Sequence, residues 1–167
     1  PERVAQVFFY ALALAMGVQA VAFAQAKPDF TGTWRFNQAK SSPNIAGNTP
    51  VVPFPSQLVV KQTATEVAID SSSVRQQPMS ALFKLDGSKV TIQAPSGISE
   101  TGEAKLEGAN LVVTSRRSFS SPAGETVVDF KEVWSLSGSA LTIIKTRTQD
   151  GDSSSETAVF DKIQGPS

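Results

Sequence analysis

The sequence predicts an all-β fold, an up-and-down antiparallel β-barrel of eight to ten strands. From residue 27 onward, short runs rich in Val, Ile, Thr and Phe alternate with turn residues, which is typical of strands. No apolar pattern of helical period and useful length interrupts these runs. Short connections favour an antiparallel meander, and closure of a long meander removes its exposed edges. An open β-sandwich is the alternative.

Ten strands are expected, and most of the turns between them contain Gly. The strands are predicted near residues 30–36, 57–63, 66–71, 79–85, 89–94, 99–106, 110–118, 126–136, 140–149 and 154–162. The dipeptides Asp86-Gly87 and Asp150-Gly151 are the strongest hairpin signals, because Asp-Gly suits the type I′ turn that matches strand twist. Further turns are expected at residues 108–110, 122–124 and 137–139.

One predicted connection, residues 37–56, is long. It contains Pro43, Pro50, Pro53 and Pro55, so it cannot form a regular helix pair. Long loops inside compact domains are usually functional lids or irregular excursions. We expect an extended segment near the mouth of the barrel.

Residues 1–26 have the pattern of a secretory signal peptide. Basic Arg3 precedes an apolar run over residues 7–16, and Ala24-Gln25-Ala26 is a small-residue cleavage site. The alternative, a retained membrane anchor, does not account for this cleavage site. Residues 27–167 are therefore expected to be a single barrel domain that is periplasmic or secreted, with no stable membrane anchor after cleavage.

Composition limits the possible partners and chemistry. Lys plus Arg and Asp plus Glu number 15 each, so no overall field favours nucleic acid or an anionic membrane. The chain lacks Cys and His, and its one Tyr is Tyr10 in the leader. Disulfides, a Ser–His–Asp triad and zinc sites built on His or Cys are thereby excluded. We expect no cofactor, no metal site and no enzymatic role, and favour a monomer.

The segment Phe30-Thr31-Gly32-Thr33-Trp34 resembles the opening strand of the lipocalins and fatty-acid-binding proteins, the calycin superfamily. In that superfamily the Trp plugs the closed end of the barrel, so the resemblance implies that Gly32 and Trp34 form a barrel-end motif. Residues 29–41, 132–137, 141–143 and 159–162 together resemble a group of uncharacterised exported bacterial lipocalin-like proteins.

Three departures accompany this resemblance. Fatty-acid-binding proteins hold the ligand carboxylate with an Arg-x-Tyr pair on the last strand, where this chain has Ala158 and Phe160. Their helical lid after the first strand is replaced here by the Pro-rich connection. The lipocalin Arg that covers the Trp has no evident equivalent, although Lys162 could lie over an aromatic face. The resemblance thus implies the barrel and not fatty-acid specificity.

Strand alternation places a group of aromatic and charged side chains on one face of the last three strands. An aromatic wall that ends in converging charges is typical of a ligand pocket. The predicted ligand-binding residues are Phe130, Glu132, Trp134, Lys145, Arg147, Glu156 and Phe160. Alternatively, the charges are exposed cross-strand pairs and the two Trp side chains are core. The Arg116-Arg117 pair is interpreted as a solvated strand end.

We therefore expect an exported protein that binds a small, mainly apolar molecule inside the barrel. A structural or protein-interaction barrel of the cell envelope with a filled core is the first alternative. An enzyme that uses Glu132 and Lys145 as a tuned acid–base pair is the second. The interior volume discriminates between the first two, because ligand pockets usually exceed about 300 Å³.

Overall fold

The structure is a computed structural model that describes residues 26–42, 54–74, 77–94 and 98–164, and in these ranges the chain forms ten strands and no helix. The strands are β1 (Gly32–Ser42), β2 (Gln57–Gln62), β3 (Glu66–Ser72), β4 (Met79–Lys84), β5 (Val90–Ile92), β6 (Ile98–Glu107), β7 (Asn110–Ser121), β8 (Gly124–Ser137), β9 (Ala140–Gln149) and β10 (Asp152–Ile163). The predicted all-β fold is confirmed, and all ten predicted strands are present. The predicted leader and most of the Pro-rich connection lie outside the described residues.

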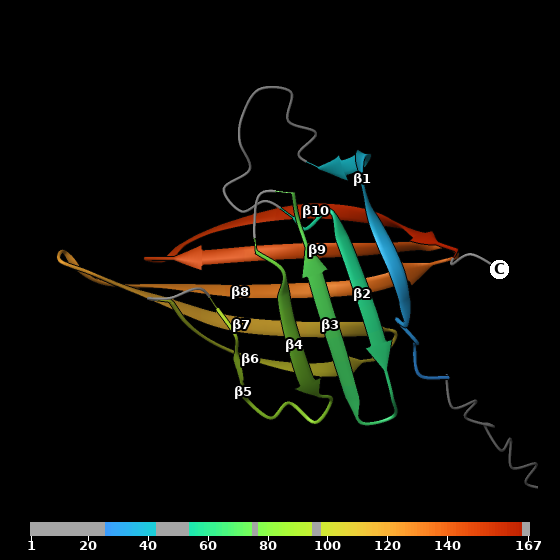
Figure 1. Ribbon diagram of the computed structural model, residues 1–167, viewed down its shortest axis with the longest axis horizontal. Helices are drawn as coiled ribbons and strands as arrows, with labels where there is room; N and C mark the ends of the chain where they lie inside the picture. Colours follow the sequence, from blue (N-terminus) through green and yellow to red (C-terminus); the bar gives the residue numbers. More distant parts are fainter. Residues whose placement is uncertain (1–25, 43–53, 75–76, 95–97, 165–167) are drawn as a thin grey trace, which may run out of the picture.

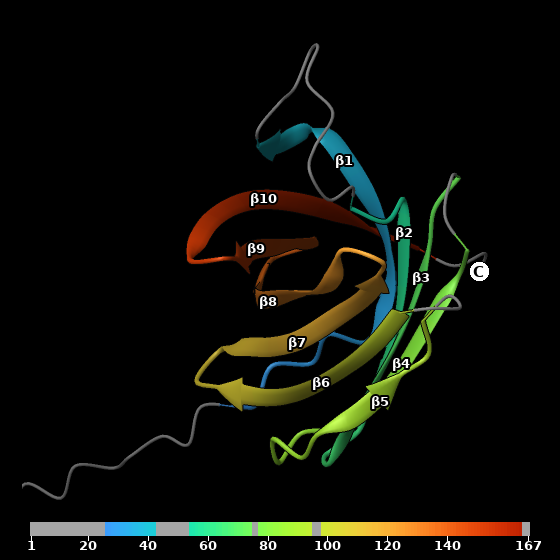
Figure 2. The same cartoon turned by 90° about the vertical axis from the view of Figure 1, so that its left-hand side faces the viewer.

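The strands form one antiparallel sheet that curls into a nearly closed barrel (Figure 1). Strand order is β4-β3-β2-β1-β10-β9-β8-β7-β6-β5, so β1 pairs with the last strand and the two sheet edges are β4 and β5. Figure 2 shows the sheet curving until these edges face each other. Within the described ranges no hydrogen-bonded ladder joins them. The described ranges contain no helix that is long and apolar enough to cross a membrane.

The hairpin predicted at Asp86-Gly87 is wrong. The Leu85 amide donates to the Thr65 carbonyl, and the Gly87 amide donates to the Ala104 carbonyl. The segment between β4 and β5 is therefore held by the turn before β3 on one side and by β6 on the other. By contrast, Asp150 and Gly151 both have positive φ, at 53° and 88°, and join β9 to β10 as predicted, with Gln149 opposite Asp152.

Strand β1 is longer than predicted. The expected connection from residue 37 begins instead after Ser42, because the pairing of β1 with β10 shifts register between Asn37 and Ser42 and then resumes opposite Thr157. Ser41 holds this irregularity: its hydroxyl donates to the Asn37 carbonyl at 2.7 Å and accepts from the Val159 amide at 2.9 Å. A β-bulge of this kind lets a strand bend without ending.

Apolar side chains close one end of the barrel. This closed end consists of Phe30, Trp34, Leu111, Leu141 and Phe160, each at most 1% exposed. The Trp34 indole N–H donates to the Phe30 carbonyl at 3.0 Å. Lys162 lies over the Trp34 ring, with Nζ 5.2 Å from the ring centroid, which realises the aromatic contact that the sequence allowed for this residue. A Cβ at Gly32 would come within 2.7 Å of the Lys162 Cε, so the missing side chain leaves room for this contact.

Candidate ligand-binding site

The barrel interior contains a partly open cavity of about 560 Å³. Most of its wall is apolar, with Phe54, Leu58, Ile69, Met79, Ala81, Phe83, Ile92, Ile98, Val113, Phe130, Trp134 and Ile143 contributing. Four charged side chains also line it among the described residues: Glu100, Arg117, Glu132 and Lys145. A mostly apolar wall with a few converging polar groups is the usual composition of a small-molecule site.

Strand register explains why these side chains meet. Glu132 on β8 lies opposite Lys145 on β9, and Trp134 lies opposite Ile143. Because alternate side chains of a strand point to the same face, all four project into the cavity that they line. The shared face predicted for the last strands is confirmed by this register.

Glu132 and Lys145 form one ion pair inside the cavity. Lys145 Nζ is 2.9 Å from Glu132 Oε1, and the two side chains are about one-fifth exposed. The other oxygen, Oε2, accepts the indole N–H of Trp134 at 2.9 Å. Both oxygens of the Glu132 carboxylate are thus engaged by protein donors, one of them charged. The acid–base enzyme suggested for this pair stays a prediction.

Glu100 and Arg117 form a second, more buried ion pair. Arg117 donates from Nε to Glu100 Oε2 at 2.8 Å, and its NH2 group lies 2.7 Å from the same oxygen. The Glu100 side chain is only 6% exposed and that of Arg117 26%. Sequence reasoning missed Glu100 and interpreted Arg117 as part of a solvated strand end. The alternation of Val113, Ser115 and Arg117 along β7 was the signal for an inward position.

Phe130 lies between the two interior cations. Its ring centroid is 5.5 Å from the Arg117 guanidinium carbon and 5.3 Å from Lys145 Nζ. Lys145 Nζ is also 5.7 Å from the centroid of Phe54, which stacks on Phe36. Aromatic faces attract cations, so these rings hold both cations at the cavity wall. Phe54 shows that the described end of the Pro-rich connection reaches the cavity.

The structure separates the predicted ligand-binding residues into two groups. Phe130, Glu132, Trp134 and Lys145 line the cavity. The other three, Arg147, Glu156 and Phe160, are not part of the described cavity lining. Arg147 donates a hydrogen bond to Gln149, and Glu156 on β10 lies opposite Lys145 on β9. Phe160 is fully buried at the closed end. Of the second group, only Phe160 belongs to the buried apolar core, whereas Arg147 and Glu156 are half-buried.

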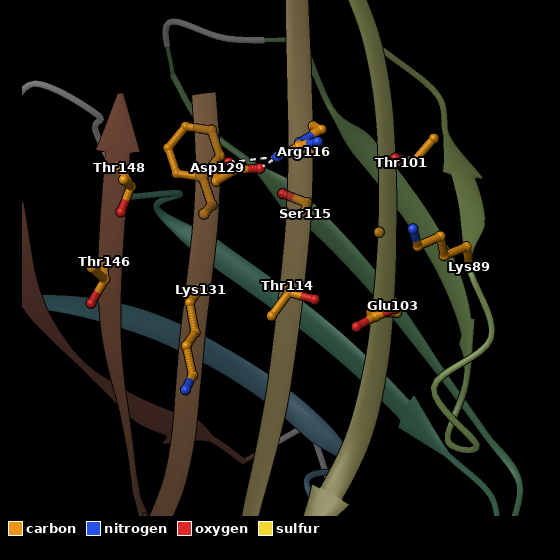
Figure 3. Close-up of a pocket in the computed structure, with 12 residues that line it drawn as sticks. Lys89, Thr101, Glu103, Thr114, Ser115, Arg116, Asp129, Lys131, Thr146 and Thr148 are labelled. Carbon is orange, nitrogen blue, oxygen red and sulfur yellow. Dashed lines mark hydrogen bonds and ion pairs between the residues drawn. The ribbon is translucent and has the colours of Figure 1, made fainter. Parts of the chain in front are cut away.

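A second hollow of about 420 Å³ lies on the outer face of β6–β9 (Figure 3). Its labelled side chains are mostly Thr and charged residues, and Arg116 and Asp129 pair with each other there at 2.7 and 3.0 Å. Hydrogen bonding from Arg116 holds the pKa of the Asp129 carboxyl below its ordinary value. Since both side chains are about half exposed or more and Phe130 is the one large apolar side chain in the described lining of this hollow, we place the candidate site inside the barrel. The described residues contain no group of three His, Cys, Asp or Glu side chains that could hold a metal ion.

No protein-family model matches the sequence, and a search of curated proteins found no match. Solved structures do resemble this chain. The zebrafish ileal bile acid-binding protein complexed with cholic acid has a TM-score of 0.53 and 14% identity, over 80% of this chain and 98% of that one. A secretary abundant heat soluble (SAHS) protein from Ramazzottius varieornatus has a TM-score of 0.50 and 14% identity, over 83% and 98%. At this identity the likeness shows the fold alone, an antiparallel β-barrel.

Proposed function

We propose that this protein binds a small, mainly apolar molecule inside the barrel. The observation that carries this proposal is the interior cavity of about 560 Å³ with its apolar wall and inward charges. Its volume lies within the range of about 300–1,000 Å³ usual for ligand pockets. The filled-core alternative required a solid interior, and the cavity counts against it. The zebrafish protein, a barrel of the same fold, is described as a bile acid-binding protein complexed with cholic acid.

Titration with the uncharged dye Nile red tests this proposal. Dye fluorescence should rise and saturate on addition of the purified protein, because an apolar wall excludes water from the bound dye. Ser115→Phe places a ring in the cavity, which Ser115 lines, and should weaken dye binding by about tenfold or more. Ser118→Phe, on the outward face of the same strand by alternation, is the matched control and should leave dye affinity unchanged.

Equal dye binding by the wild-type protein and Ser115→Phe would place the dye elsewhere and contradict the proposal. Circular dichroism of both variants checks that the strands are retained, since overpacking a core costs about 1–3 kcal/mol. Native mass spectrometry of the protein purified from its own host would then identify any co-purifying small molecule.

We further propose that the protein is exported and acts in the periplasm or outside the cell. The support is the apolar run followed by Ala24-Gln25-Ala26, which is typical of a cleaved leader. N-terminal sequencing of protein recovered from the cell envelope fraction should begin at or close to Lys27. Recovery of an intact leader in the membrane fraction would contradict cleavage.

A further inference from the structure

Resting on the proposed binding function, we propose that the cavity selects an uncharged ligand that carries a hydrogen-bond acceptor, such as an alcohol, ester or ketone oxygen, beside an apolar body. Carboxylates and ammonium compounds of the same size should bind less well. The basis is the charge balance of the cavity wall. Its charged side chains among the described residues are two acids and two bases, Glu100, Arg117, Glu132 and Lys145.

Each cavity cation already has its own counter-charge. Lys145 pairs with Glu132 at 2.9 Å, and Arg117 pairs with Glu100 at 2.7 Å. The wall is therefore electrically neutral over the described residues, although it is strongly polar at these two places. In the described cavity lining, both cations are therefore already paired, and neither offers an unbalanced positive charge to a ligand anion.

A ligand carboxylate would have to enter this neutral wall at a cost. Loss of hydration penalises a charge brought into a poorly solvated interior unless a partner of opposite sign compensates it. A carboxylate that accepts a remaining donor of Lys145 or Arg117 sits beside a cation whose charge is already balanced, so it brings an uncompensated negative charge next to Glu132 or Glu100. Displacing either glutamate instead leaves a protein carboxylate without compensation. Displacing Glu132 would also break its hydrogen bond from Trp134. A ligand ammonium has the corresponding cost: both glutamates are already paired with cations, so the ammonium adds an uncompensated positive charge beside Lys145 or Arg117.

An uncharged oxygen avoids this exchange. A lysine ammonium has three N–H donors and a guanidinium has five, more than Glu132 and Glu100 accept from them in the described structure. An alcohol, ester or ketone oxygen can accept one of the remaining donors while both ion pairs stay intact. The apolar body would then pack on Phe130, Phe83 and Ile143, which line the same cavity.

Displacement of Nile red by a matched set of compounds that share a twelve-carbon chain tests this selectivity. The set is 1-dodecanol, methyl laurate, lauric acid and dodecylamine, used below their aggregation concentrations at pH 8, where the acid is ionised and the amine is protonated. We expect the affinity of the alcohol and the ester to be higher than that of the acid and the amine by about tenfold or more.

Variants that remove one charge of the Glu132–Lys145 pair should change which ligand the cavity prefers. Glu132→Gln keeps the side-chain shape and releases Lys145, so the acid should gain about tenfold or more over the alcohol relative to wild type. Lys145→Gln releases Glu132 instead and should favour the amine by a similar factor. The double variant is neutral again, and its preference for the alcohol should return. A role in folding alone would not shift the preference toward the acid in one variant and toward the amine in the other.

Asp129→Asn is the matched control, because it removes a carboxylate from the outward Arg116 pair of the same sheet and should leave the order of the four compounds unchanged. If Nile red and all four compounds fail to bind, the proposed function fails and this inference fails with it. If they bind but wild type prefers or equally accepts lauric acid, or if Glu132→Gln leaves the ratio of acid affinity to alcohol affinity unchanged, only this inference is overturned.

Discussion

In both halves of the barrel interior, alternate side chains of each strand point inward, but one half is packed closed and the other lines a cavity. At the closed end the inward positions hold large apolar residues such as Trp34 and Phe160, which are at most 1% exposed. Further along the same sheet, β6–β9 direct two ion pairs inward, and a cavity of about 560 Å³ remains. Apolar side chains can interdigitate until no space is left. A charge must keep its partner and its remaining hydrogen bonds, so the charged half resists close packing.

The largest expected effect is a difference in the free energy of unfolding that is lost when one aromatic ring is removed from each half. Trp34→Ala should lower the free energy of unfolding by about 3–5 kcal/mol, because it removes a buried ring from close-packed surroundings. Phe130→Ala should cost at least about 1 kcal/mol less, because that ring already borders an open cavity. Urea unfolding followed by circular dichroism measures both. Equal costs would mean that the halves are packed alike.

A smaller effect separates interior from exterior ion pairs. Glu100→Gln should lower the free energy of unfolding by about 1–3 kcal/mol, because the Arg117 charge loses its buried partner. In Asp129→Asn the altered side chain is 48% exposed, against 6% for Glu100, so water replaces the lost partner and the change should be close to measurement error. A larger cost for Asp129→Asn would contradict this distinction between the two faces of the sheet.

The cover of the closed end can be tested through Gly32 and Lys162. Lys162→Met should cost about 0.5–1 kcal/mol, the usual strength of an exposed cation–π contact. Gly32→Ala should cost more, because its φ of 155° is one that L residues rarely adopt, and because its Cβ would come within 2.7 Å of the Lys162 Cε and displace that side chain from Trp34. In a double-mutant cycle with Lys162→Ala, which removes Cε as well as the charge, Gly32→Ala should be less damaging than in the wild-type protein. Additive costs would show that the two positions act independently.

The smallest effect concerns the polar contacts that hold the outer part of β1 to β10. Hydrogen bonds from Asn37 and Lys40 hold the pKa of the Asp161 carboxyl below its ordinary value of 3.8. The carboxylate therefore stabilises the fold above that value, and the stabilisation is lost as the pH falls through the lower, folded-state pKa. Asp161→Asn should give a slightly lower melting temperature than wild type at pH 7. The difference should shrink as the pH falls below 3.8 and vanish once the pH is below the folded-state pKa; a difference independent of pH would refute the assignment.

Much of the fold could be predicted from local pattern. All ten strands lie where runs of Val, Ile, Thr and Phe between turn residues indicated them, and Asp150-Gly151 forms its predicted turn with both φ angles positive. Turn preference and alternation are properties of neighbouring residues, so they are visible in the chain itself. The shared face of Glu132, Trp134 and Lys145 followed from the same counting.

The wrong predictions concern positions whose structure depends on hydrogen bonds to strands that are distant in the sequence. Asp86-Gly87 carries the same dipeptide signal as Asp150-Gly151, yet its backbone bonds to β6, because β4 and β5 are the opposite edges of the sheet. Strand β1 continues past residue 36 because Ser41 bonds to Val159, which is 118 residues away. Neither partner can be inferred from the local segment.

By itself, the sequence determined the strands, the shared face of the last three strands and the absence of His and Cys chemistry, since all three follow from residue identity and short-range spacing. The tertiary structure alone decided that Arg117 meets Glu100 and that the Trp134 indole donates to Glu132. It also decided that Phe160 is enclosed at the closed end while Phe130 borders a cavity. The physical reason is that burial and charge pairing depend on which strands become neighbours when the sheet closes, and on how completely their side chains fill the space between them.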